Sequence, residues 1–201
     1  MIDENAFGVL VSYFAIEDEE YAMDAQAFAE RFELFQRVLF EHVAARELAA
    51  NARAMQLGHA LYLEFPEDDI LETDPVDAAA AAEKRRTLLA WVRAARQLLS
   101  DHDFETVAVV THGGRWLPSD ASGAAPDRLG STPLVTGLLP SEPLRRALYA
   151  ESASHGIPAE ADAWGPGLYA DTEVLSALGL SPKNAPTPLV AADATFFRVS
   201  R

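Results

Sequence analysis

Residues Glu105–Trp116 read ETVAVVTHGGRW, and they join a nearly uninterrupted apolar run to a glycine turn. A short apolar run of this kind is typical of a strand that is covered on both faces. We therefore predict a buried strand over 105–111. The turn that follows it, residues 112–116, places a histidine, two glycines, an arginine and a tryptophan at one end of that strand.

The chain before this strand is rich in helical patterns. Apolar residues at three- and four-residue spacing predict a helix from residue 24 to about residue 57. Strands are predicted over 7–14 (FGVLVSYF) and 60–65 (ALYLEF), and Asp74-Pro75 predicts the start of a second helix that runs to Ser100. The order strand, helix, strand makes residues 60–111 a candidate crossover unit. An antiparallel arrangement around one long helix would produce much the same pattern.

The chain after Gly113 is punctuated by turn-forming residues. Nine of its 11 glycines lie at or beyond Gly113, and ten of its 12 prolines lie at or beyond Pro118. We predict an exposed loop over 118–133, helices over 141–154 and 171–179, and a last strand over 194–199. The prolines at the end of 184–188 predict an extended segment there.

These elements predict an α+β fold, or a small α/β fold, in a single compact domain over residues 1–201. Its helix-rich, acidic part would be residues 1–112, arranged around a short sheet, and its turn-rich part would be residues 113–201. The net charge is −15, and 22 of the 31 acidic residues lie in residues 1–105. The first part therefore carries most of the negative charge.

The charge and composition exclude several classes of partner and site. A strongly acidic chain is unsuited to nucleic acid or to an anionic membrane surface, because both need clustered basic residues. The sequence has no run of about 18 apolar residues, so it predicts no membrane span. The N-terminus lacks the features of a signal peptide, so we expect a cytoplasmic location. The absence of cysteine excludes disulfides, thiolate metal sites and thiol catalysis.

The turn after the predicted buried strand is the main candidate for a ligand or partner site. Ligands gather where parallel strands end, and glycines there let the backbone approach an anion. A second candidate segment, residues 164–169, places two aromatic residues around a Gly-Pro-Gly turn. The candidate site residues are His112, Gly113, Gly114, Arg115, Trp116, Trp164 and Tyr169. The alternative is structural: a strand that ends in a turn, with aromatic residues that close the core.

No motif identifies a metal site, a cofactor or a catalytic nucleophile. The five histidines are scattered without metal-ligand spacing, and no phosphate-binding glycine motif or Gly-x-Ser-x-Gly occurs. Residues 107–114 (VAVVTHGG) resemble the segment around the second catalytic histidine of the histidine phosphatase superfamily. That family also needs an Arg-His-Gly motif on its first strand, and no histidine precedes His42 here. We predict no metal and no cofactor, and we leave the catalytic residues unassigned.

Two functions from different classes remain. The first is a non-catalytic acidic binding protein, such as an inhibitor or immunity-type antagonist that masks a basic protein partner. The alternative is a small-molecule enzyme or binder with its site at the end of strand 105–111, using His112 and Arg115, with loop 118–133 as a lid. A homodimer is a further expectation, because Phe40 and Tyr21 leave a possible second apolar face on or near the first helix.

Overall fold

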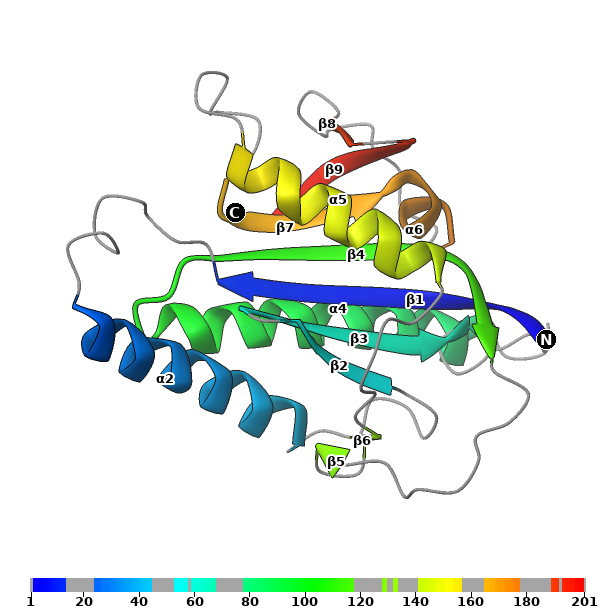
Figure 1. Ribbon diagram of the computed structural model, residues 1–201. Coiled ribbons are helices and arrows are strands. Elements are labelled where there is room, and N and C mark those ends of the chain that lie inside the picture. The colour runs from blue at the N-terminus through cyan, green and yellow to red at the C-terminus, as the bar shows by residue number, and fades with distance from the viewer. Residues whose placement is uncertain are drawn as a thin grey trace.

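The protein is built on one mixed sheet of seven strands. The computed structural model describes residues 2–13, 24–44, 53–57, 59–67, 78–117, 128–129, 132–133, 141–156, 165–177, 189–191 and 193–200. The strands lie in the order β2-β3-β1-β4-β7-β9-β8. Their bounds are β1 Ile2–Tyr13, β2 Arg53–Leu57, β3 Ala60–Pro66, β4 Thr106–Leu117, β7 Gly167–Asp171, β8 Leu189–Ala191 and β9 Ala194–Ser200. Strands from both halves of the sequence therefore share one sheet (Figure 1).

The sheet is antiparallel except at one pair of strands. β1 lies between β3 and β4 and is antiparallel to both, so β3 and β4 run in the same direction with β1 between them. β4 and β7 pair in parallel, with Val107 opposite Gly167 and Val110 opposite Ala170. The helix between β3 and β4 thus connects two strands that a third strand separates, which is a split form of the predicted crossover unit.

Helices cover both faces of the sheet (Figure 1). α2 (Ala25–Ala44) and α4 (Ala78–Ser100) pack on one face, where Phe35 and Trp91 meet alternate residues of β1, β3 and β4. α5 (Glu142–Gly156) packs on the other face through Leu144 and Ala147. A strand buried on both faces needs apolar side chains at consecutive positions, which is why residues 107–110 are Val-Ala-Val-Val. Two smaller pieces complete the fold: helix α6 (Thr172–Ala177), and a short hairpin of β5 (Arg128–Leu129) and β6 (Thr132–Pro133).

The α+β class predicted from the sequence is confirmed, and several elements differ in extent. The helix expected over 24–57 is described only as far as Ala44, and residues 53–57 form the edge strand β2. The apolar residues Ala54 and Met55 of β2 fit a half-buried strand as well as they fit a helix. β4 is longer than predicted and runs through the expected turn to Leu117, so the expected boundary after residue 112 falls inside a strand.

Some sequence-based expectations concern residues outside the described ranges. These are Tyr21, Trp164, the extended segment 184–188 and most of the loop 118–133, of which only the hairpin β5-β6 is described. Phe40, expected to contribute a free apolar face, is partly buried and packs against the core. No helix in the described ranges is both long enough and apolar enough to cross a membrane.

Gly8 in the middle of β1 allows α5 to approach the sheet. A Cβ atom at this position would lie 2.6 Å from the Tyr62 hydroxyl and 2.8 Å from Cβ of Pro143, at the start of α5. Both distances are too short for a real contact, and both neighbours are rigid. Gly114 on β4 provides a contrast, because a Cβ atom there would meet only Glu142, at 3.9 Å.

We predict that Gly8→Ala lowers the free energy of unfolding by about 1–3 kcal/mol, because overpacking forces Tyr62 or α5 to move. Gly114→Ala serves as the control and should change stability much less. Urea denaturation of both variants measures the difference. Equal stability of the two variants would contradict the tight approach of α5 at Gly8.

Candidate functional site

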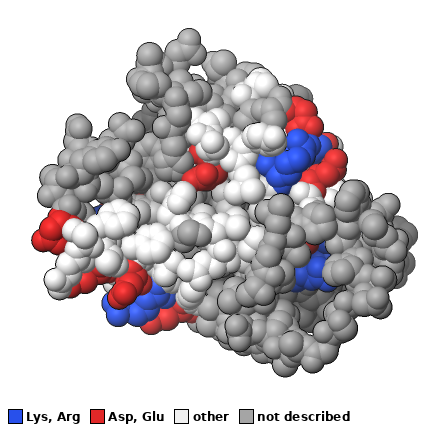
Figure 2. Space-filling view, viewed as in Figure 1, with Lys and Arg blue, Asp and Glu red and all other residues white. Residues whose placement is uncertain are grey.

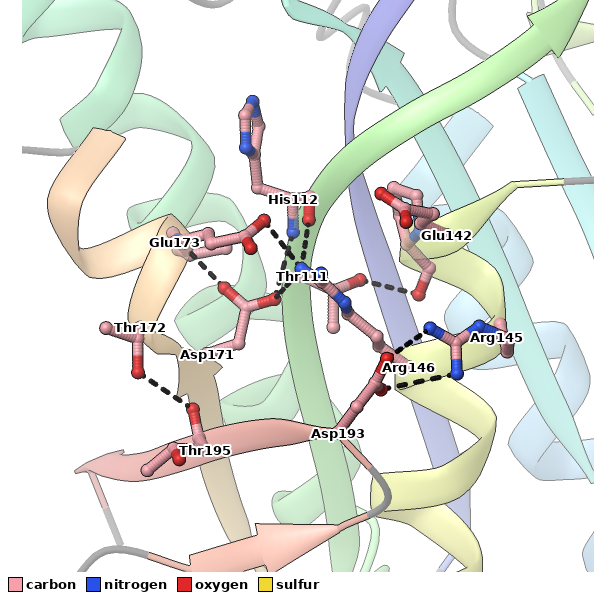
Figure 3. A network of polar contacts seen from close by, with 12 residues as sticks. Thr111, His112, Glu142, Arg145, Arg146, Asp171, Thr172, Glu173, Asp193 and Thr195 are labelled. Carbon is pink, nitrogen blue, oxygen red and sulfur yellow. Dashed lines mark hydrogen bonds and ion pairs between the residues drawn. The ribbon is translucent and has the colours of Figure 1, made fainter.

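The candidate site forms where β4 extends beyond its parallel neighbour. β7 pairs with β4 only as far as Val110, whereas β1 stays paired with β4 to Leu117. The β4 residues after Thr111 therefore present backbone groups toward the beginnings of α5 and α6. Buried backbone N–H and C=O groups need partners. Polar side chains provide them here, and Figure 3 shows this network from close by.

Carboxylates accept hydrogen bonds from two backbone N–H groups of this extension. The N–H of His112 donates to Oδ2 of Asp171 over 3.2 Å, and the N–H of Gly114 donates to Oε2 of Glu142 over 3.3 Å. Gly113 makes room for the second contact, because a Cβ atom there would lie 2.8 Å from Oε2 of Glu142. The glycine pair predicted to let an anion approach the backbone thus has a side-chain carboxylate beside it.

Asp171 is a buried carboxylate at the junction of β7 and α6. Its Oδ1 accepts a hydrogen bond from the N–H of Val174 over 2.6 Å, so Asp171 caps the start of α6. Burial raises the pKa of Asp171 to about 6, although the two backbone hydrogen bonds and the charge of Arg146 lower it. Desolvation therefore outweighs the interactions that favour the charged form.

Arg146 on α5 connects the carboxyl ends of β4 and β7. Its Nη1 donates to the carbonyl of His112 over 2.9 Å and to Oε2 of Glu173 over 2.6 Å, and lies 3.7 Å from Oδ2 of Asp171. The hydrogen bond to Glu173 raises the pKa of Arg146. The Arg146 side chain is 12% exposed and that of Glu173 is 50% exposed, so Glu173 is the partner that lies at the solvent.

The His112 side chain points away from this network (Figure 3). Its ring packs on Phe7 with the ring centroids 4.8 Å apart, on the face that α2 and α4 cover. Its Nε2 lies 3.3 Å from Oε2 of Glu67, the residue directly after β3. A histidine beside a carboxylate is a common arrangement in sites of proton transfer.

Arg115 lies on the opposite face of the sheet from His112. Side chains alternate along a strand, so residues three apart point to opposite sides. Nη1 of Arg115 lies 3.6 Å from Oε1 of Glu64, and the Tyr62 hydroxyl donates to Oε2 of Glu64 over 3.0 Å. Burial, and next the charge of Glu64, raise the pKa of Tyr62 well above its usual value.

This buried cluster supports the beginning of α5. The Ser141 hydroxyl oxygen accepts a hydrogen bond from the N–H of Leu144, so Ser141 caps α5, and the backbone of Ser141 bridges to Arg115. The Tyr62 hydroxyl lies 3.5 Å from that of Ser141. Arg115 thus lies among residues that position α5.

The structure brings four of the predicted site residues, His112, Gly113, Gly114 and Arg115, to one strand end. The side chains of His112 and Arg115 lie on opposite faces of the sheet. The side chain of Trp116 and the whole of Trp164 lie outside what the structure describes. Tyr169 lies further back on β7, opposite Val109, and its hydroxyl donates to the carbonyl of Gly165. Their joint role as a site therefore stays a prediction.

Sequence reasoning missed the charged partners at this strand end. These are Glu67, Glu142, Arg146, Asp171 and Glu173. The available signals were the predicted helix starts at residues 141 and 171, which include Glu142 and Asp171 and were recognised only as helix starts. Among the described residues, no group of three or more histidine, aspartate or glutamate side chains is placed to hold a metal ion.

Comparison with known proteins identifies the fold. The sequence matches no protein-family model and no curated protein. Solved structures that match include a bacterial light-regulated adenylyl cyclase (TM-score 0.53, 10% identity, covering 99% of this chain and 91% of that chain). The adenylyl cyclase CyaB from P. aeruginosa also matches (TM-score 0.52, 9% identity, 98% and 94%), as does the guanylyl cyclase Cya2 (TM-score 0.53, 9% identity, 99% and 92%).

At this level of identity the likeness establishes the fold alone, which is that of nucleotide cyclases over nearly the whole chain. The prediction of a non-catalytic, immunity-type antagonist of a basic protein is therefore wrong, since the structural neighbours are enzymes. It relied on net charge, which reports on solubility and not on fold. In Figure 2, acidic and basic side chains lie close together on the described part of this face of the molecule. The described part does not form one acidic patch.

The raised pKa of Asp171 predicts a pH dependence of stability. The folded protein binds this proton more tightly than the unfolded chain, whose pKa is near 3.8. Ionisation therefore favours the unfolded state, and the free energy of unfolding should fall as the pH rises from about 4 to about 6. Relative to Asp171→Asn, the wild type should lose about 2–3 kcal/mol over this range, measured by urea denaturation.

Asp193→Asn is the matched control, with the opposite sign. The Arg145 guanidinium, through a hydrogen bond, lowers the pKa of the exposed Asp193. The stability that Asp193 contributes should therefore be lost as the pH falls through its folded pKa. A wild type that gains stability relative to Asp171→Asn as the pH rises from about 4 to about 6 would contradict the dominant effect of burial on Asp171.

Proposed function

We propose that this chain binds and acts on a small anionic molecule at the carboxyl ends of β4 and β7, across the edge of β4 that β7 leaves unpaired after Val110. The anion-binding groups of α5 lie on one face of the sheet there, and His112, the proton-transferring residue, lies on the other. The observation that carries the proposal is the contact between His112 and Glu67 at the end of the one parallel strand pair among the described strands. Ligand sites in sheets of this kind gather where parallel strands end. The fold shared with adenylyl and guanylyl cyclases supports a role in small-molecule chemistry.

The anionic part of the ligand is proposed to bind at the glycine pair. The carboxylate of Glu142 lies on the N–H of Gly114 from the exposed first turn of α5, so a ligand phosphate or carboxylate can replace it there. Arg146 is a cation at this strand end: it donates to the carbonyl of His112 and is held by Glu173 on its solvent side. Arg guanidinium groups and backbone N–H groups together are the donors that bind such anions.

Arg115 is proposed as a positioning residue in this scheme. Its contact with buried Glu64 directs it toward the base of α5, on the other face from His112. It would keep the first turn of α5, and with it Glu142 and Arg146, at the correct distance from the glycine pair.

The names of the structural neighbours make adenine and guanine nucleotides the first probes. Isothermal titration with ATP, GTP and their 3′,5′-cyclic monophosphates should give measurable binding of at least one of them. Arg146→Gln should weaken that binding about 10-fold to 100-fold, because it removes a charged hydrogen bond. A wild-type protein that binds none of these nucleotides would contradict the proposal.

Turnover separates His112 from the binding groups. His112→Asn should abolish conversion of the bound nucleotide, which chromatography measures. The dissociation constant of the nucleotide should change little. His102→Asn is the matched control, because His102 is an exposed histidine directly after α4. Equal turnover in wild type and His112→Asn would remove His112 from the chemistry.

A further inference from the structure

The backbone of His112 is held by two charged side chains from different elements. Its N–H donates to Oδ2 of Asp171 over 3.2 Å, and its carbonyl accepts from Nη1 of Arg146 over 2.9 Å. These two side chains also approach each other, with Nη1 of Arg146 3.7 Å from Oδ2 of Asp171. Because β7 pairs with β4 only as far as Val110, Asp171 and Arg146 take the place of a strand neighbour at His112 (Figure 3).

The ring of the same residue lies on the opposite face of the sheet. It packs on the buried Phe7, and its Nε2 lies 3.3 Å from Oε2 of Glu67. The His112 side chain is 14% exposed, so its surroundings leave it little freedom to turn. A confined ring follows its Cα–Cβ bond, whose direction the backbone sets. The two backbone hydrogen bonds therefore help to fix where Nε2 lies relative to Glu67.

Arg146 shares one nitrogen between two acceptors. Besides the His112 carbonyl, Nη1 donates to Oε2 of Glu173 over 2.6 Å. That second hydrogen bond raises the pKa of Arg146, and the charges of Asp171 and Glu142 act in the same direction, while burial lowers it. A negative charge that arrives beside Arg146 therefore competes with the His112 carbonyl for the same donor.

We propose that Asp171 and Arg146 are positioning residues, which hold the His112 backbone and thereby set the contact between the His112 ring and Glu67. The two faces of the site are then coupled. An anion that draws Arg146 away from the His112 carbonyl on the α5 face also changes the ring contact on the face that α2 and α4 cover. A purely structural role would end at the closure of the β4 edge and leave the ring unaffected. The positioning belongs to the free protein, and its consequence for turnover rests on the proposed function.

Two variants remove these backbone contacts with little change elsewhere. Asp171→Ser keeps a preferred N-cap residue at the start of α6, but serine lacks the second oxygen, which accepts from the His112 N–H. Arg146→Met keeps the apolar part of the side chain and removes the donor. Arg145→Met is the matched control, because Arg145 is the preceding residue of α5 and pairs with Asp193 over 2.8 Å. Far-UV circular dichroism checks that all three variants are folded.

Long-range proton–nitrogen NMR spectra of the imidazole rings measure the effect in ligand-free protein at fixed pH. The His112 signal is identified as the one of five histidine signals that His112→Asn lacks. Glu67→Gln gives the direction in which the Nε2 signal moves when the contact with the carboxylate is lost. Asp171→Ser and Arg146→Met should both move the signal in that direction, whereas Arg145→Met should leave it at the wild-type position. Arg146→Lys should return it toward the wild type, because an ammonium group can still donate to the His112 carbonyl.

The direction of these shifts distinguishes positioning from simple electrostatics. Asp171→Ser removes a negative charge and Arg146→Met removes a positive one, so a response to charge alone would have opposite signs in the two variants. Shifts of opposite sign would therefore overturn the proposal. A His112 signal that stays at the wild-type position in both variants would overturn it as well, whether or not any nucleotide binds.

Turnover separates this inference from the proposed function. For a nucleotide that the wild type converts, Asp171→Ser should lower kcat about 10-fold to 100-fold through misplacement of His112, while the Kd changes little. A weaker Kd with unchanged kcat would assign Asp171 to ligand binding and contradict a positioning role. If the wild type binds no nucleotide, the proposed function fails, and the spectra of the ligand-free variants still decide whether Asp171 and Arg146 position His112.

Discussion

The carboxylate of Asp171, the last residue of β7, connects that strand to β4, α5 and α6. It accepts from the backbone of β4 at His112, accepts from the backbone of α6 at Val174, and lies beside Arg146 of α5. A helix of six residues is too short to be stable alone, so α6 depends on its cap and on the apolar contacts of Val174 and Leu175. Ionising this carboxylate opposes folding, yet its hydrogen bonds fix where three elements meet.

The network around Asp171 exists because the strands differ in length. β1 and β4 each have 12 residues, whereas β7 has five. Where β7 ends, the backbone of β4 loses its ladder on that side, and its polar groups need other partners. Glu142 and Arg146 of α5 and Asp171 at the end of β7 take that role. A site at this place is therefore a consequence of the sheet, with its chemistry supplied by the helices that begin there.

Local sequence patterns were enough to predict the elements that have a clear apolar run or a clear helix cap. The apolar run of β4, the cap of α5 and the last strand β9 are all present near their predicted bounds. β7 was missed because a Gly-Pro-Gly turn precedes only five residues, and β2 because its two apolar residues continued a helical stripe. Tertiary pairing selects the strand in both cases.

The site was harder to predict than the fold for a geometric reason. The strand was expected to end at residue 111, so residues 112–116 were treated as a turn with no assigned faces. Because β4 continues, the alternation of side chains places His112 and Arg115 on opposite faces. The partner of the His112 backbone, Asp171, is 59 residues away in the sequence. A partner at such a distance becomes visible only when β7 is paired with β4.

The two ends of the β4-β7 pair differ in how their charges are balanced. At the carboxyl ends, Arg146 lies among the carboxylates of Glu173 and Asp171, and Asp171 and Glu142 accept hydrogen bonds from backbone N–H groups of β4. At the amino ends, Arg96 donates to the Thr106 hydroxyl and Arg198 lies over the Tyr169 ring, and neither forms an ion pair with a described carboxylate. Helices fill both faces of the sheet, so little polar chemistry can occur there. The described polar contacts between the helices and the sheet therefore gather at the strand ends, as those of Glu142 and Arg146 do at the carboxyl end of β4.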